Sequence, residues 1–124
     1  MATTSIQMQK RAFSEPEESR PAGRGHGDTV SLGRATFTRI ALEPGWRWST
    51  DVKLITHTHS CQATHTGVVL SGRLHTVMDD GTEMDLGPGD AYHIPPGHDA
   101  WVTGDEPYVC VDVSGDDLWA KPAR

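Results

Sequence analysis

Histidine is the residue type in this chain with the clearest capacity for chemistry, and six of the seven histidines lie between residues 57 and 98. Neutral imidazole is the commonest protein ligand for divalent transition metals, so three or four converging imidazoles would form a metal site. His57 and His59 are two residues apart, a spacing that puts both side chains on one face of a β-strand. The six are His57, His59, His65, His75, His93 and His98.

Short strands separated by tight turns are the elements that must position these histidines. The chain has 13 glycines and 8 prolines in 124 residues, and they recur as turn punctuation between segments rich in β-formers. Closely spaced strands without a long helical period predict an antiparallel sandwich or barrel. The expected strands are 29–32, 34–42, 52–61 (running into a loop), 66–70, 73–78, 82–86, 91–94, 100–103 and 107–113.

The length fits one domain with polar ends. Residues 1–28 are polar and rich in glycine and proline, which predicts a flexible arm with one short strand at most. An edge strand exchanged with a second subunit is the alternative for this arm. Residues 29–113 would form the barrel and residues 114–124 a tail.

Composition limits the kinds of binding partner and the location in the cell that are expected. The formal charge of -6, without a run of lysine or arginine, argues against nucleic acid or an anionic membrane as the main partner. The start of the chain lacks the apolar run of a signal peptide, and no segment approaches the length of a membrane span, so a soluble cytoplasmic protein is expected. Cys61 and Cys110 form no C-x-x-C pair and are expected to be reduced.

Two glycine-containing motifs resemble those of the cupin family. The first family motif is a glycine, then His-x-His, three or four residues, a glutamate, six residues and a glycine. Here Gly45 precedes His57-Thr58-His59, and His65 stands at the glutamate place with six residues between it and Gly72. The second motif is a glycine, five residues, Pro-x-Gly, two residues and a histidine, and the segment from Gly89 to His98 is similar to it.

The resemblance covers roughly residues 30–113 and implies an all-β fold, a double-stranded β-helix (jelly-roll or cupin) barrel of antiparallel strands. It also implies a divalent metal in the barrel mouth and, as in similar small cupins, a homodimer. Trp46 and Trp48 point to the same face and are expected to pack in the core or at a dimer interface. The ligands that the resemblance implies are His57, His59, His65 and His98.

The ligand spacing departs from the family pattern and leaves alternatives open. Five residues, not three or four, separate His59 from His65, and counting back from His65 at the family spacing selects His59 and Cys61 instead. Cys61 is therefore an alternative ligand, and a thiolate would favour zinc or thiolate-bound iron. The last family histidine falls on Ala100, and His98 stands two residues earlier with the same strand parity.

Other side chains are expected to build the pocket. His93, if it points inward, would replace His98 or transfer protons, because imidazole titrates near neutral pH. The expected pocket wall is Tyr92, Trp101 and Met78. His75 has no motif support, and a surface role is the better interpretation.

The function predicted from these features is that of a metal-dependent cupin acting on a small organic molecule. Oxygenase-type chemistry with iron comes first, because an all-histidine set resembles those of cupin dioxygenases, although manganese, nickel, copper and zinc suit imidazole ligands as well. The alternative is a non-catalytic cupin module that binds a small ligand or metal for sensing or storage.

Overall fold

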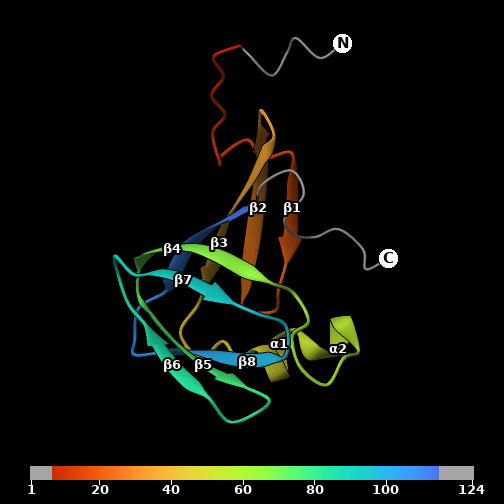
Figure 1. The fold of residues 1–124 in the computed structure, drawn as a ribbon, viewed down its shortest axis with the longest axis vertical. Coiled ribbons are helices and arrows are strands. Elements are labelled where there is room, and N and C mark those ends of the chain that lie inside the picture. The colour runs from red at the N-terminus through yellow and green to blue at the C-terminus, as the bar shows by residue number, and fades with distance from the viewer. Residues whose placement is uncertain (1–6, 115–124) are drawn as a thin grey trace.

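The computed structural model describes residues 7–114, which form two antiparallel β-sheets and two short helical turns (Figure 1). The larger sheet has the strand order β1-β2-β3-β9-β4-β7, and the smaller sheet has the order β6-β5-β8. This arrangement confirms the predicted all-β cupin-type fold. The strands are β1 (Glu18–Pro21), β2 (Gly25–Leu32), β3 (Ala35–Leu42), β4 (His65–Ser71), β5 (Arg73–Met78), β6 (Glu83–Leu86), β7 (Ala91–Ile94), β8 (His98–Thr103) and β9 (Tyr108–Ser114).

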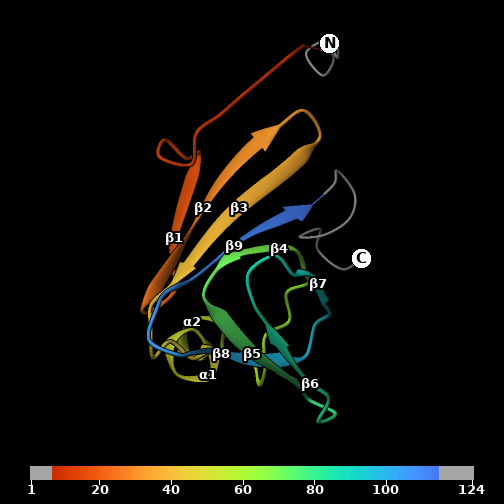
Figure 2. The ribbon, with the colours of Figure 1, turned by 90° about the vertical axis from the view of Figure 1, so that its left-hand side faces the viewer.

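The first two strands extend the large sheet into the segment that was expected to be an arm. β2 pairs with β3 over its whole length, from Gly25 opposite Leu42 to Leu32 opposite Ala35, and β1 pairs with β2. Figure 2 shows β2 and β3 reaching well beyond the small sheet. Most side chains of these strands stay partly exposed, so the pairing needs little apolar sequence, and composition alone did not reveal both strands.

The segment predicted as a strand over 52–61 is helical where it begins, and that part of the prediction is wrong. It contains α2 (Lys53–Thr56), directly after α1 (Trp48–Asp51). The Asp51 carboxylate accepts the backbone N–H of Arg47 at 2.8 Å, which closes the first turn in spite of the β-formers that follow. In residues 7–114 no helix is long and apolar enough to cross a membrane.

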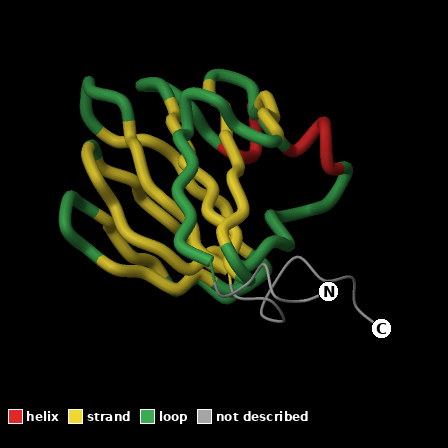
Figure 3. Tube along the Cα trace, turned by 90° about the horizontal axis from the view of Figure 1, so that it is seen from above, coloured by secondary structure: helices red, strands yellow, loops and turns green. Residues whose placement is uncertain are grey.

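The core lies between the two sheets and next to the helical turns, which sit at one side of the molecule in Figure 3. Trp46 and Trp48 belong to this core, with 6% and 5% of their surface exposed. The Trp46 indole N–H donates to the carbonyl of Ala22 at 2.7 Å, so the ring ties the chain before β2 to the barrel. Because both rings are already buried within one chain, the two tryptophans serve as core residues.

Candidate metal centre

Three metal-ligating side chains meet inside the barrel: Cys61, His65 and His98. One donor atom of each lies within 4.8 Å of the others. His65 begins β4 and His98 begins β8, so the two sheets each contribute one imidazole. Cys61 is held beside His98 by an antiparallel bridge, in which its backbone N–H donates to the His98 carbonyl at 2.8 Å.

Each of the two imidazoles is oriented by a hydrogen bond at Nδ1. The His98 Nδ1 lies 2.8 Å from the carbonyl oxygen of Pro95, and a carbonyl only accepts, so this nitrogen carries the proton. The His65 Nδ1 lies 2.6 Å from Oδ2 of Asp112. Both rings therefore present Nε2 for ligation, and oriented imidazoles of this kind are characteristic of metal sites.

Asp112 joins His65 to Tyr92. It is only 4% exposed, and its second oxygen accepts a short hydrogen bond from the Tyr92 hydroxyl. Gly67 of β4 lies between these groups, where an added Cβ would come within 2.8 Å of the Tyr92 hydroxyl and 2.9 Å of the Asp112 Cα. The backbone oxygen of Val111 would be nearer still, so a side chain at this position would clash with β9 itself. Gly67 therefore allows β4 to pack closely against β9 beside Tyr92 and Asp112.

Asp112 is a residue of the site that was not predicted from the sequence. Its signal was present, because β9 alternates and its inward positions are Tyr108, Cys110, Asp112 and Ser114, all buried. A carboxylate at an inward position of such a strand requires a buried partner.

Charge at the site favours a thiolate beside a protonated imidazole when no metal is bound. Burial alone raises the pKa of the Cys61 thiol, but hydrogen bonds from His65 and His98 outweigh it and bring that pKa to about 6. Burial alone lowers the pKa of His65, but the hydrogen bonds with Asp112 and Cys61 raise it to about 10. A metal cation can take the place of the proton between the two side chains.

The donor spacing also fits a metal ion. Zinc-to-sulfur and zinc-to-nitrogen bonds of about 2.3 and 2.0–2.1 Å at a tetrahedral angle place the two donors about 3.6 Å apart. The Cys61 Sγ and the His65 Nε2 are 3.8 Å apart. This separation, which in the metal-free protein is that of a hydrogen bond, is therefore compatible with a metal ion held between the thiolate and the imidazole.

A cavity of about 750 Å³ opens beside the three donors and is lined by all of them. Aromatic side chains supply much of its wall, namely Trp46, Trp48, Tyr92 and Tyr108. Burial raises the pKa of both tyrosines, so both hydroxyls stay protonated. Pockets with mostly apolar walls and a few convergent polar groups are typical of small-molecule sites.

Two predicted ligands lie apart from this cluster. His57 ends α2 in the left-handed region, with φ of 60°, and its side chain is exposed. His59 is exposed as well. His57 and His59 would point to the same side only if they lay on a β-strand. The helical turn that ends at His57 takes the place of that strand. The structure brings together His65, His98 and the alternative ligand Cys61.

His93 faces away from the cavity. It is exposed, and its Nδ1 lies 2.9 Å from the Thr66 hydroxyl on the neighbouring strand. Successive residues of β7 point to opposite faces, so the inward position belongs to its neighbour Tyr92. The structure thus offers no route by which His93 replaces His98 or transfers protons in the site.

Of the three expected wall residues, Tyr92 lines the cavity, and the other two do not. Trp101 lies on the outer face of the small sheet, where the Arg47 guanidinium sits 4.0 Å above its ring and His75 packs 4.8 Å from it. Met78 is half-buried beside Gly97. Both side chains lie on strands of the small sheet, outside the lining of the cavity.

Comparison with known families decides the assignment. Residues 38–114 match the family described as Cupin domain. The chain belongs to the cupin family. A search of curated proteins found no match.

Solved structures share the fold at low sequence identity. A Rhizobium leguminosarum protein of unknown function is 23% identical, with a TM-score of 0.62, over 87% of this chain and 96% of that one. A cupin 2 conserved barrel protein from Salinispora arenicola is 17% identical, with a TM-score of 0.62, covering 90% and 91%. The polyketide cyclase RemF from Streptomyces resistomycificus is 19% identical, with a TM-score of 0.61, covering 93% and 83%.

Proposed function

We propose that this cupin binds a divalent transition metal through Cys61, His65 and His98 and acts on a small organic molecule in the adjoining cavity. The observation that carries this proposal is the convergence of the three donors on the cavity wall. The hydrogen bonds at Nδ1 of both imidazoles support it, because they hold each ring and leave its Nε2 as the atom that can bind a metal.

The donor set favours zinc, with thiolate-bound iron as the second choice. A thiolate with two imidazoles is a three-ligand set of the kind that leaves a position open for substrate. When bound there, a divalent metal supplies Lewis-acid chemistry on a substrate carbonyl or hydroxyl oxygen. The iron oxygenase expected from an all-histidine set becomes the second candidate, since the converging set contains Cys61.

The protein's own residues would do three things in such a reaction. Asp112 holds the His65 ring in place, and the Tyr92 hydroxyl holds Asp112 from its other side. Trp46, Trp48, Tyr92 and Tyr108 would offer apolar surface against which the bound molecule packs. We propose a non-oxygenase reaction for this chain because of its donor set. The polyketide cyclase RemF, which shares the fold, is compatible with this proposal.

Metal content of tag-free protein tests the ligand assignment. Elemental analysis of Cys61→Ala, His65→Ala and His98→Ala is expected to show loss of the near-stoichiometric metal of the wild-type protein. His57→Ala and His59→Ala are the matched controls and are expected to keep it. Retention of metal in His65→Ala, or its loss in His59→Ala, would contradict the proposed ligand set.

Turnover separates the enzyme from the binding module. The zinc-loaded and iron-loaded proteins are each screened against carbonyl and hydroxy compounds, with oxygen consumption recorded in parallel. Oxygen-independent turnover with zinc supports the Lewis-acid reaction, and oxygen-dependent turnover with iron supports the oxygenase. A fully loaded protein that only binds these compounds supports the non-catalytic sensor or storage module.

Two expectations from the sequence stay predictions. A homodimer is proposed from the resemblance to small cupins, and light scattering on the purified protein tests it. A cytoplasmic location is the second prediction, and it includes the expectation that both cysteines are reduced. Neither Cys61 nor Cys110 is in a disulfide in the structure.

A further inference from the structure

The cavity beside the metal centre continues far beyond it. Its lining begins at Cys61 and the two ligating histidines and follows the inner face of the large sheet to Thr29 and Thr36 near the tip of the long β2–β3 hairpin. Figure 2 shows how far these strands extend past the small sheet. The volume of about 750 Å³ is that of a site for a drug-sized molecule, much larger than a two- or three-carbon compound requires.

The wall combines apolar and polar parts. It is apolar where Ile40, Leu42 and Tyr108 join the two tryptophans. Two residues along β3 from Ile40, the Thr38 hydroxyl lies 3.0 Å from that of Thr29 at the paired position of β2, and Thr38 is also paired with Asp112 of β9. One hydrogen bond between two hydroxyls uses one proton, so the second proton and the remaining lone pairs are available to a ligand.

The charged groups of the lining have partners. Inside the fold, His65 is bonded to Asp112. At the open edge of the sheet, Glu18 and Arg20 form a solvent-exposed ion pair of 2.7 Å, and His26 lies 3.3 Å from Asp28. Moving a charged ligand from water into an apolar channel is costly unless the channel supplies an opposite charge. The wall therefore favours an uncharged ligand.

We propose that the substrate of this cupin is an extended, uncharged and mainly apolar molecule. Its carbonyl or hydroxyl oxygen would lie at the metal centre, and a second polar group would reach the Thr29–Thr38 pair. This inference rests on the proposed function, because it takes the metal centre as the reactive end of the cavity.

A homologous series of n-alkyl hydroxamates, from acetohydroxamate to dodecanohydroxamate, tests the proposal on the zinc-loaded protein. These probes carry metal-coordinating oxygens on an apolar chain of variable length. Calorimetric titration is expected to show affinity rising up to about fourfold per added methylene until the apolar part of the cavity is filled. Affinity that stays flat beyond butanohydroxamate would overturn the proposal.

The same titrations distinguish failure of this inference from failure of the proposed function. A protein that takes up no zinc refutes the metal centre. A zinc-loaded protein that binds acetohydroxamate, but gains nothing from a longer chain, keeps the metal centre and refutes the extended substrate.

A blocked cavity gives the sharpest control. Gly27 of β2 lines the cavity, and an added Cβ there would face Thr38 at 3.3 Å and Ile40 at 3.8 Å. Gly27→Phe is expected to weaken dodecanohydroxamate at least tenfold and to leave acetohydroxamate unchanged. Arg39→Phe, on the opposite face of β3, is the matched control and is expected to change neither. Should Gly27→Phe not fold, Ile40→Trp fills the same space from β3.

The polar end has its own test. A hydroxyl at the far end of a long-chain hydroxamate is expected to bind about fivefold more weakly to the Thr29→Val/Thr38→Val double variant than to the wild type. The unhydroxylated probe of equal length is expected to bind the two proteins equally well. Equal affinities for the hydroxylated probe would overturn the role of the threonine pair.

Discussion

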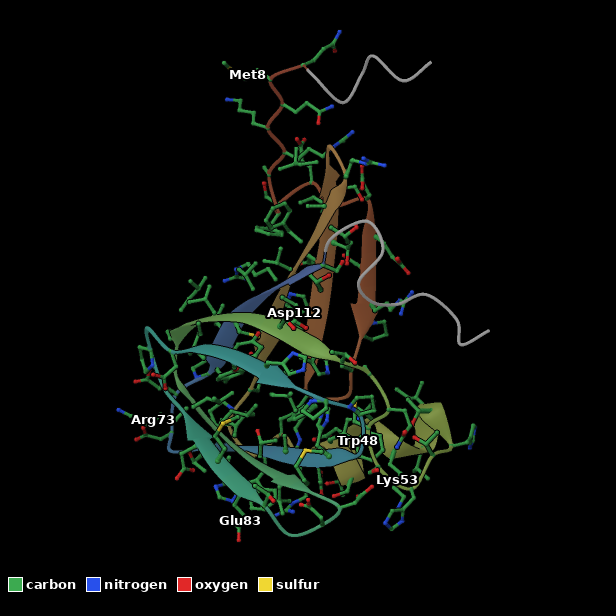
Figure 4. All side chains as sticks on the ribbon, viewed as in Figure 1. Met8, Trp48, Lys53, Arg73, Glu83 and Asp112 are labelled. Atoms are coloured by element: carbon green, nitrogen blue, oxygen red, sulfur yellow. The ribbon has the colours of Figure 1, made fainter. Side chains whose placement is uncertain are left out.

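Two histidine–carboxylate groups in this protein have similar bond lengths and different surroundings. Inside the barrel, the His65 Nδ1 lies 2.6 Å from Asp112. On the outer face of the small sheet, the two ring nitrogens of His75 lie 2.7 Å from Asp85 and 2.6 Å from Glu83. Figure 4 shows Asp112 in the middle of the molecule and Glu83 at its margin.

The difference between the two groups shows what makes an imidazole available for chemistry. Both ring nitrogens of His75 are hydrogen-bonded to carboxylates, so neither is left for a metal or a ligand. In His65 only Nδ1 is bonded to a carboxylate, and Nε2 lies on the cavity side. Hydrogen bonds with Asp85 and Glu83 raise the pKa of His75, but those carboxylates are 78% and 60% exposed, and solvent weakens such pairs.

Removing the inner carboxylate is expected to have the largest effect on stability. Asp112→Ala leaves the Tyr92 hydroxyl and the His65 Nδ1 without their partner in a buried site, and breaking a buried pair in this way costs about 3–5 kcal/mol. Asp85→Ala on the outer face is expected to cost about 0–1 kcal/mol. Urea denaturation of the metal-free proteins measures both, and equal losses would contradict the comparison.

Changing only the charge of the inner carboxylate is expected to weaken metal binding. Asp112→Asn keeps the size of the side chain but supplies a weaker acceptor for His65, and changes of this kind lower metal affinity about 10–100-fold. Zinc affinity is measured by competition with a chelator. Asp85→Asn is the control and is expected to bind zinc as the wild type does.

Proton competition is expected to make metal affinity depend on pH. The pKa of Cys61 is lowered to about 6 and that of His65 is raised to about 10, so between these values the thiolate is already formed and His65 still holds a proton. Metal binding must release that proton, and affinity should rise about tenfold per pH unit as pH increases through this range. Chelator competition from pH 6.5 to 9 measures the slope, and a pH-independent affinity would exclude displacement of the His65 proton.

Removing the outer imidazole is expected to have the smallest effect. His75→Ala loses two exposed ion pairs and the contact with Trp101, and a cost of about 1 kcal/mol or less follows. Metal content should stay that of the wild type. Loss of metal in this variant would show that the outer face supports the inner site.

The turns marked by glycine and proline predicted an antiparallel sandwich or barrel, and the resemblance of the two motifs to those of cupins specified the fold. Gly72 and Gly97 adopt φ values of 78° and 95°, in the region that favours glycine, and they mark turns of the two motifs. Local rules of this kind need no knowledge of distant contacts. The helical turn over 53–56 was not predicted, because its β-formers continue from the turn over 48–51, where backbone hydrogen bonds such as that from Thr56 N–H to the Val52 carbonyl override their own preference.

The ligand set lay beyond the reach of the sequence alone. His59 and Cys61 are both compatible with the motif, and only the bridge that pairs Cys61 with His98 selects the cysteine. Likewise, alternation along β7 permits His93 to point either way until Tyr92 is known to occupy the inner face.

By itself, the sequence determined an antiparallel sandwich or barrel, because turns and strand periods are local properties of the chain, and the resemblance of two motifs narrowed this to a cupin with histidines near its mouth. Tertiary structure alone decided which side chains meet. Cys61, His65 and Asp112 lie on three separate segments, and their approach depends on the register of β4 against β9 and on the bridge between Cys61 and His98. A change of one residue in either pairing would turn these side chains to the opposite face.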